Sequence, residues 1–280
     1  METTTHTVPP QSDNHSHTII LLHGRDSIAS EFACEFFESQ AGDGQTLPQV
    51  FPTFKWVFPA SRMRNSARFE SDLSQWFDIW SVEEPSEKKG IQIDGLRESI
   101  EEILDVIRGE ALLVPQSRII LGGISQGCAT AIHTLLYAGI RLGGFVGFCS
   151  WLPFQEDIAA ITASSISHDT TIRKIRSIFS GSDYEPASLT ELKQKSQGPA
   201  IETPVFLSHS LDDNVVPIQN GRELKRTISD LGFKTIWKEY EDGGHWINES
   251  QGVDDVIAFL KDRLWIVLCK SYKSWILLRD

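Results

Sequence analysis

The sequence predicts an α/β fold in which helices cover both faces of a doubly wound, mostly parallel β-sheet. Short, wholly apolar runs recur along the chain, such as residues 18–22 and 119–122, and such runs are typical of strands buried on both faces. Amphipathic segments separate them, and the clearest, residues 94–108, carries apolar side chains at three- and four-residue spacing. That spacing indicates a helix with one buried face. Strands that alternate with helices form parallel sheets.

The expected elements follow one another without an internal repeat. A helix begins at Ser27 or Ser30 and runs to about Ser39, and Gly109 ends the helix that begins at Asp94, because glycine favours the position after a helix end. The predicted strands are 18–22, 54–58, 119–122, 144–149, 204–209 and 234–240, and the further predicted helices are 126–139, 219–231 and 253–263.

Three segments depart from this alternation. Residues 1–17 are rich in Thr, His, Ser and Pro and are expected to form a disordered tail before a domain at 18–263. Residues 154–203 are Ser/Thr-rich and weakly periodic, which predicts an insertion in the form of a lid before the 204–209 strand. Residues 264–280 read as an amphipathic extension that packs on the domain, docks on a partner or lies on a membrane.

Composition narrows the classes of partner. The 280 residues carry a net charge of −12, which argues against nucleic acid and allows at most peripheral contact with a membrane. The four cysteines form no Cys-x-x-Cys pair, and no apolar leader is visible at the start. We therefore expect reduced thiols, a cytoplasmic location and no metal or other cofactor. The sequence makes no prediction of oligomeric state.

The most informative motif is Gly123-Ile124-Ser125-Gln126-Gly127, which follows a predicted strand and opens a predicted helix. A strand, a sharp turn and a helix are the context of a nucleophile elbow, which exposes the serine hydroxyl above the sheet. The two glycines are needed because side chains there would collide with the neighbouring strand or helix. A glycine-rich turn with an ordinary serine is the alternative.

A serine nucleophile needs a base, and the base needs an acid that orients it. Asp213 is the preferred acid because it follows a clear strand, with Asp212 and Asp183 as alternatives. His245 is the preferred base because it follows the last strand and two glycines. The other histidines after the serine are His133, His168 and His209.

Acyl transfer also needs backbone N–H groups aimed at the negative charge that develops on the carbonyl oxygen. Gln126 supplies one of them from the start of its helix, where the helix dipole helps. The turn after His23-Gly24 supplies the other, from the N–H of Arg25. A simple turn at the end of the strand is the alternative for His23-Gly24.

In these residues the sequence resembles the acyl-protein thioesterase and small carboxylesterase family of α/β-hydrolases, over residues 18–261. The resemblance implies the α/β-hydrolase fold, with Ser125, Asp213 and His245 as catalytic triad. It further implies Arg25 and Gln126 as oxyanion donors and Trp76 and Leu152 as substrate-binding residues. The motifs that carry it are Leu21-Leu22-His23-Gly24, Asp26-Ser27, Phe58-Pro59-Ala60, Trp76-Phe77-Asp78-Ile79, Gly123 to Gly127, Trp151-Leu152-Pro153, Asp213-Asn214-Val215-Val216-Pro217 and Gly244-His245.

The chain departs from the pattern at Ser210, where similar members have glycine after the histidine, and in its long insertion and C-terminal extension. The sequence therefore predicts a serine hydrolase of acyl thioesters or oxygen esters, acting on a small acyl ester or an S-acylated protein. Palmitoyl-cysteine, lysophospholipid and short-chain esters all stay open as substrates. The alternative is a catalytically silent binding module on a hydrolase scaffold.

Overall fold

The computed structural model describes residues 4–165, 167–179 and 186–262. Within them a seven-stranded sheet has the order β1-β3-β2-β6-β7-β8-β9, in which β1 runs antiparallel to β3 and all other neighbours are parallel. The strands are β1 (His6–Val8), β2 (His17–Leu22), β3 (Phe54–Phe58), β6 (Ile119–Ile124), β7 (Gly144–Phe148), β8 (Val205–Ser210) and β9 (Thr235–Tyr240). The predicted α/β-hydrolase architecture of a mostly parallel sheet between helices is confirmed.

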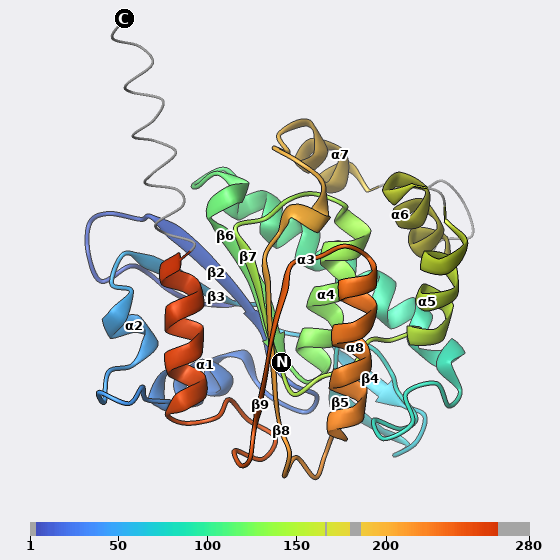
Figure 1. Cartoon of the computed structure of the whole chain (residues 1–280), viewed down its shortest axis with the longest axis horizontal. Coiled ribbons are helices and arrows are strands. Elements are labelled where there is room, and N and C mark those ends of the chain that lie inside the picture. Colours follow the sequence, from blue (N-terminus) through green and yellow to red (C-terminus); the bar gives the residue numbers. More distant parts are fainter. Residues whose placement is uncertain (1–3, 166, 180–185, 263–280) are drawn as a thin grey trace, which may run out of the picture.

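Helices pack on both faces of the sheet (Figure 1). One face is covered by α3 (Ile93–Glu110), α4 (Gln126–Ala138) and α8 (Ile218–Asp230), and the other by α1 (Ala29–Glu38) and residues 251–262. Strand β2 shows why its run is apolar throughout. Ile20 and Leu22 join the core under the first set of helices, whereas Ile19 and Leu21 join the core under the second. Side chains alternate between the faces of a strand, so a strand covered on both sides needs apolar residues at every position.

The segment before β2 corrects one prediction. Residues 1–17 were expected to be disordered, and this is wrong for the described part, because β1 pairs with the edge of β3 from His6↔Phe58 to Val8↔Trp56. His17 already belongs to β2, and its ring lies 4.9 Å from that of Phe54. A polar segment can order by backbone pairing alone when it covers the unpaired N–H and C=O groups of a sheet edge.

The insertion at 154–203 is helical in its described residues. It contains α5 (Gln155–Ser164), α6 (His168–Ser177), α7 (Ala187–Gln194) and a short 3₁₀ helix, η3 (Ala200–Glu202). Its apolar side chains enter the core beside α3, α4 and α8. Figure 1 shows α6 and α7 at the top of the view, whereas the β8–α8 connection lies at the bottom. The described part of the insertion therefore thickens one helical layer.

Smaller elements connect the strands and helices of the main layers. A hairpin of β4 (Met63–Ser66) and β5 (Ser71–Ser74) follows β3, and the remaining short helices are α2 (Leu47–Val50), η1 (Lys89–Gln92) and η2 (Gln116–Arg118).

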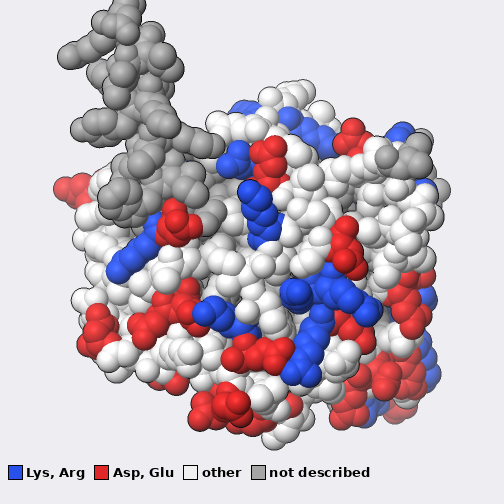
Figure 2. All heavy atoms as spheres, viewed as in Figure 1, with Lys and Arg blue, Asp and Glu red and all other residues white. Residues whose placement is uncertain are grey.

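Figure 2 shows acidic side chains gathered along the lower edge of this view, with basic side chains interspersed above them. In the described ranges, no helix is both long and apolar enough to cross a bilayer. The predicted extension at 264–280 lies outside the described residues.

Candidate active site

Ser125 occupies the sharp turn between β6 and α4. Its backbone has φ 54° and ψ −125°, a conformation that residues with a side chain rarely adopt. The turn is held by two contacts: the Ser125 N–H donates to the carbonyl of Phe148 at 2.9 Å, and the hydroxyl of Ser150 donates to the carbonyl of Ser125 at 2.7 Å. This strained strand-to-helix turn is the geometry expected of a nucleophile elbow.

The two flanking glycines let the turn approach β2 closely. A Cβ on Gly123 would lie 2.6 Å from the carbonyl oxygen of Leu22 and 2.8 Å from the carbonyl carbon of Gly127. A Cβ on Gly127 would collide with the carbonyl oxygens of Leu22 and His23. Each of these partners is backbone, which cannot turn aside as a flexible side chain can. The sequence predicts that side chains at these two glycines would collide with neighbouring elements, and these distances show the atoms that they would meet.

Asp213 and His245 come from the loops after two neighbouring parallel strands, β8 and β9. Parallel strands end at the same edge of a sheet, so residues 32 positions apart meet there. The Nδ1 atom of His245 lies 2.8 Å from Oδ2 of Asp213. The N–H of Gly244 donates to Oδ1 of Asp212 at 2.8 Å. The alternative acid therefore holds the loop that carries His245, whereas Asp213 contacts its imidazole.

Ser125 and His245 line one cavity of about 270 Å³. A histidine Nδ1 beside a carboxylate carries the proton, which leaves Nε2 with a free lone pair that can accept a proton. The structure thus brings serine, histidine and aspartate to one site. The cavity is also lined by Gly24, Arg25, Ser27, Phe32, Glu35, Val82, Ile124, Gln126, Trp151, Val215 and Trp246. None of these residues belongs to 154–203, but Phe154, Gln155, Glu156 and Asp157 of that insertion line a second cavity that shares Trp151 with this one, so the lid stays a prediction.

The carboxylate of Asp213 is held in its ionised form. Burial alone would raise the pKa of this group, but hydrogen bonds from His209 and His245 and the N–H of Val216 outweigh burial and hold the pKa well below its usual range. The other carboxylate oxygen, Oδ1, accepts the N–H groups of Val215 and Val216 at 2.9 Å each. A carboxylate that stays charged stabilises a positive charge on the neighbouring imidazole.

The predicted oxyanion donors follow two neighbouring parallel strands, β2 and β6. Gln126 is the first residue of α4, and the N–H of a first helical residue has no partner within its own helix. Arg25 follows β2 and lines the same cavity. The side chain of Gln126 serves a different purpose: it accepts the N–H of Trp76 at 3.0 Å and donates to the carbonyl of Phe77 at 2.7 Å. It thereby anchors the loop before α3.

The two predicted substrate-binding residues do not line the serine cavity. Trp76 is fully buried, and its indole N–H donates to the carbonyl of His23 at 2.8 Å, so it supports the end of β2 from beneath. Leu152 is buried and lines a second cavity of about 410 Å³. Trp151 lines both cavities. The residue whose position matches that expected for Leu152 is therefore its neighbour Trp151.

The other histidines and acids take separate places. His133 is buried in α4, its Nε2 lies 2.8 Å from the carbonyl of Pro153, and burial lowers the pKa of its imidazole to about 4. His168 lies on α6 in the insertion. Asp183 lies outside the described residues. His209 is the exception, because its Nε2 lies 3.0 Å from Oδ2 of Asp213. From its place in the sequence, His209 is expected only as a rival base.

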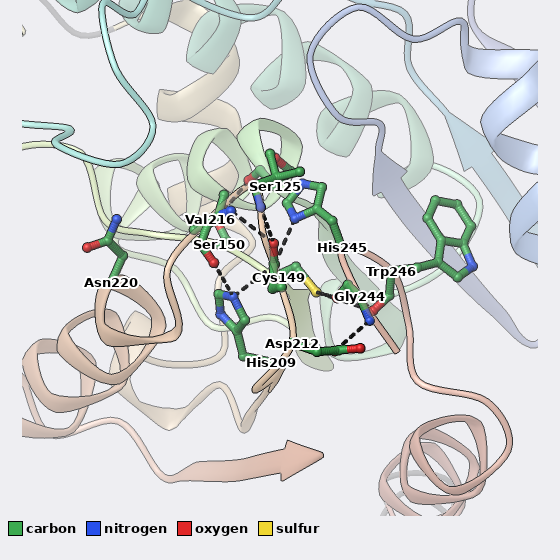
Figure 3. A network of polar contacts seen from close by, with 12 residues as sticks. Ser125, Cys149, Ser150, His209, Asp212, Val216, Asn220, Gly244, His245 and Trp246 are labelled. Atoms are coloured by element: carbon green, nitrogen blue, oxygen red, sulfur yellow. Dashed lines mark hydrogen bonds and ion pairs between the residues drawn. The ribbon is translucent and has the colours of Figure 1, made fainter. Parts of the chain in front are cut away.

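One group of side chains has the composition of a metal site. Cys149, His209 and Asp213 each place a potential ligand atom within 4.8 Å of the others. Burial, reinforced by the charge of Asp213, raises the pKa of the Cys149 thiol well above its usual range, so the sulfur carries its proton and is a poor ligand. It instead donates to the carbonyl of Trp246 at 3.2 Å. Figure 3 shows Cys149 inside this network, between the two histidines.

Comparisons with known proteins agree with this geometry. A family model described as phospholipase/carboxylesterase matches residues 3–177 and 159–264. The chain is similar to acyl-protein thioesterase 1 of Yarrowia lipolytica, at 26% identity over 260 residues that cover 91% of this chain and 95% of the relative. Acyl-protein thioesterase 1 of Candida albicans is 24% identical over 267 residues, with 91% and 95% covered.

Solved structures show the same fold. Acyl-protein thioesterase 2 of Zea mays superposes with a TM-score of 0.62 at 21% identity, covering 93% of this chain and 99% of that one. Arabidopsis thaliana SOBER1 superposes with a TM-score of 0.63 at 19% identity. Because the family model spans nearly the whole chain and the sheet, elbow and loops follow the α/β-hydrolase plan, this protein belongs to the phospholipase/carboxylesterase family.

Proposed function

We propose that this protein is a serine hydrolase that cleaves acyl thioesters or oxygen esters, with Ser125 as nucleophile, His245 as base and Asp213 as the orienting acid. The observation that carries the proposal is the 2.8 Å bond between Asp213 and His245, at the cavity that the strained Ser125 also lines. The alternative, a glycine-rich turn with an ordinary serine, gives no reason for an imidazole bonded to a buried carboxylate beside that serine.

In the proposed mechanism, the Ser125 hydroxyl attacks the acyl carbonyl while Nε2 of His245 takes its proton. The carbonyl oxygen becomes negative and is stabilised by the N–H groups of Arg25 and Gln126. His245 then gives the proton to the leaving thiol or alcohol, and the acyl group stays on Ser125. Water enters, His245 removes its proton, and collapse of the second tetrahedral species releases the carboxylic acid and restores the hydroxyl.

An acyl chain is the group that best suits the cavity wall. Phe32, Ile124, Val82, Trp151 and Trp246 present apolar surface beside the serine, and burial of each methylene of a chain contributes about 0.8 kcal/mol. The curated relatives are named acyl-protein thioesterase, which supports an S-acylated protein as substrate. The described cysteines are free thiols, and we place the enzyme in the cytoplasm, where thiols stay reduced.

The test is hydrolysis of an acyl-chain series supplied as matched thioesters and oxygen esters. Ser125→Ala removes the nucleophile, and Ser30→Ala, at an exposed position on α1, is the matched control. We expect Ser125→Ala alone to abolish turnover and labelling by a fluorophosphonate. Turnover of long-chain thioesters supports an acyl-protein thioesterase, and turnover only of short oxygen esters supports a carboxylesterase. No turnover and no labelling of the wild-type protein would contradict the proposal and favour a binding module.

A further inference from the structure

The acid of the site is contacted by two histidines. His245 approaches Asp213 from the loop after β9, and His209 approaches it from β8 itself. Figure 3 shows the two imidazoles entering the network from different sides. We propose that His209 is a positioning residue, which fixes the Asp213 carboxylate in the orientation that His245 requires. This inference rests on the proposed function, because it assigns a role within the same triad.

The donor role of His209 follows from its neighbours. Its Nε2 lies 3.0 Å from Oδ2 of Asp213 and 2.9 Å from the carbonyl oxygen of Val216. A carboxylate and a carbonyl only accept hydrogen bonds, so the proton of the imidazole is on Nε2. One N–H therefore bridges the catalytic carboxylate and the backbone of its own loop. This shared N–H links the carboxylate of Asp213 to the carbonyl of Val216, which lies three residues later in the same loop.

The surroundings of the imidazole prevent it from turning away. The side chains of His209 and Asp213 are both fully inaccessible to solvent, and the Nδ1 atom of His209 has no hydrogen-bond partner. On that side α8 packs against the ring so closely that a Cβ on Gly221 would collide with Nδ1. The indole of Trp237 lies 6.5 Å from the ring. A buried ring with one bonded nitrogen and one packed nitrogen has a single orientation, as positioning requires.

The carboxylate receives four N–H groups in total. The N–H groups of Val215 and Val216 bond Oδ1, and His209 and His245 share Oδ2. Without His209, the catalytic imidazole would be the one remaining N–H donor to Oδ2 among the described contacts. Oδ2 could then shift about the bonds that hold Oδ1 while His245 carries its transient positive charge, and it would stabilise that charge less well. The loss is specific to the transition state, so it lowers kcat and leaves KM nearly unchanged.

Charged groups near His209 are few in the described structure. Glu239 lies opposite it in the β8–β9 register and is paired with Arg222. The Cys149 thiol lies within 4.8 Å of the ligand atoms of His209 and Asp213, and its raised pKa keeps it neutral. Asp213 is thus the one carboxylate that receives a bond from this imidazole among the contacts described. Its lowered pKa agrees with a donor at this place.

The chain offers a matched control for this inference. His133 is also buried, its Nε2 also meets a backbone carbonyl and its Nδ1 also has no partner, but its carbonyl partner belongs to Pro153 and no carboxylate bond is recorded for it. Replacing His133 therefore removes a buried histidine without touching Asp213. Gln carries an N–H at nearly the same distance from the backbone as Nε2 of histidine, so His209→Gln keeps the donor that His209→Leu removes.

The experiment measures kcat, KM and melting temperature for His209→Leu, His209→Gln, His133→Leu and His133→Gln, with active-site concentration set by fluorophosphonate titration. We expect His209→Leu to lower kcat by about 10- to 100-fold, which is the effect of losing a hydrogen bond to a charged group. KM should stay within about threefold, and His209→Gln should recover most of kcat. His133→Leu should lower the melting temperature and leave kcat per active site unchanged.

Gly221→Ala gives a second route to the same residue, because its methyl group would displace the His209 ring without changing any polar group. It should lower kcat in the direction of His209→Leu. Wild-type kcat per active site in His209→Leu, or equal kcat losses in His209→Leu and His133→Leu, would overturn the positioning role. Loss of the proposed function itself would look different, because the wild-type protein would then show no turnover that depends on Ser125.

Discussion

Replacing Gly123 by alanine is the sharpest test of how the elbow is built. The new Cβ would lie 2.6 Å from the carbonyl oxygen of Leu22, 2.8 Å from the carbonyl carbon of Gly127 and 2.9 Å from the nitrogen of Cys128. Ordinary contact begins at 3.4 Å, so β2 and the start of α4 would have to separate by about 0.8 Å. Because all three atoms are backbone, side-chain rotation cannot relieve the collision.

The shift affects both stability and catalysis. Overpacking of this kind costs about 1–3 kcal/mol of folding free energy, which lowers the melting temperature by about 2–4 °C for each kcal/mol in a chain of this size. The same shift separates the residues that follow Leu22, including Arg25, from Ser125 and the N–H of Gln126. A displacement of about 1 Å in a catalytic constellation costs on the order of 100-fold in rate. A 100-fold loss corresponds to about 2.7 kcal/mol, so the protein should stay folded while its kcat falls by about two orders of magnitude.

The assay combines urea unfolding with kcat for the best ester of the acyl-chain series. The matched control is Gly109→Ala, because Gly109 lies in α3 and a Cβ there meets nothing within 4 Å. That control should stabilise the protein by about 0.5–1 kcal/mol, since alanine is the better helix former, and leave kcat unchanged. A Gly123→Ala protein with wild-type kcat would show that catalysis does not depend on the close approach of β2 to the elbow.

Three further outcomes follow from the structure. Asp213→Asn should lower kcat on the order of 10⁴-fold at neutral pH. The lowered pKa of Asp213 means that its stabilising effect is present above about pH 4 and is lost as the pH falls further, so urea unfolding of the variant should depend less on pH in that range. Burial lowers the pKa values of His17, His23 and His133 to about 4. The unfolded chain binds these protons first, so unfolding free energy should fall between about pH 6.5 and pH 4, and His133→Gln should reduce that slope. Trp76→Phe removes the bond to the His23 carbonyl and leaves a small cavity, because Trp76 is fully buried. It should cost about 2–3 kcal/mol of stability and leave KM unchanged along the acyl-chain series, whereas a strong change in KM would place Trp76 in the acyl pocket.

Local patterns in the sequence predict much of this fold. The apolar runs at β2 and β6 indicate buried strands because each strand contacts helices on both faces. The spacing of Gly123, Ser125 and Gly127 predicts the elbow because the backbone strain is confined to one turn. These features depend on neighbours in the chain, so the sequence carries them directly.

Other expectations failed because they depend on contacts between distant segments. Composition at residues 1–17 indicates disorder, but it does not reveal that the edge of β3 is open to a backbone partner. Weak periodicity at 154–203 predicts an insertion, but it does not reveal that the helices of this insertion bury apolar residues against α3, α4 and α8. Trp76 matches a family motif, and only the packing shows that its indole supports His23.

The order of serine, acid and histidine along the chain was enough to select Ser125, Asp213 and His245 as candidates. Sequence alone determined these because parallel strands end at one edge, so the loops that follow them must converge. Only the tertiary structure decided which side chain contacts which. The sequence offers His209 only as a rival base, and the fold instead places its N–H on the carboxylate of Asp213. A contact of 3.0 Å between a strand and its following loop is decided by the packing of α8 on β8, which no local pattern encodes.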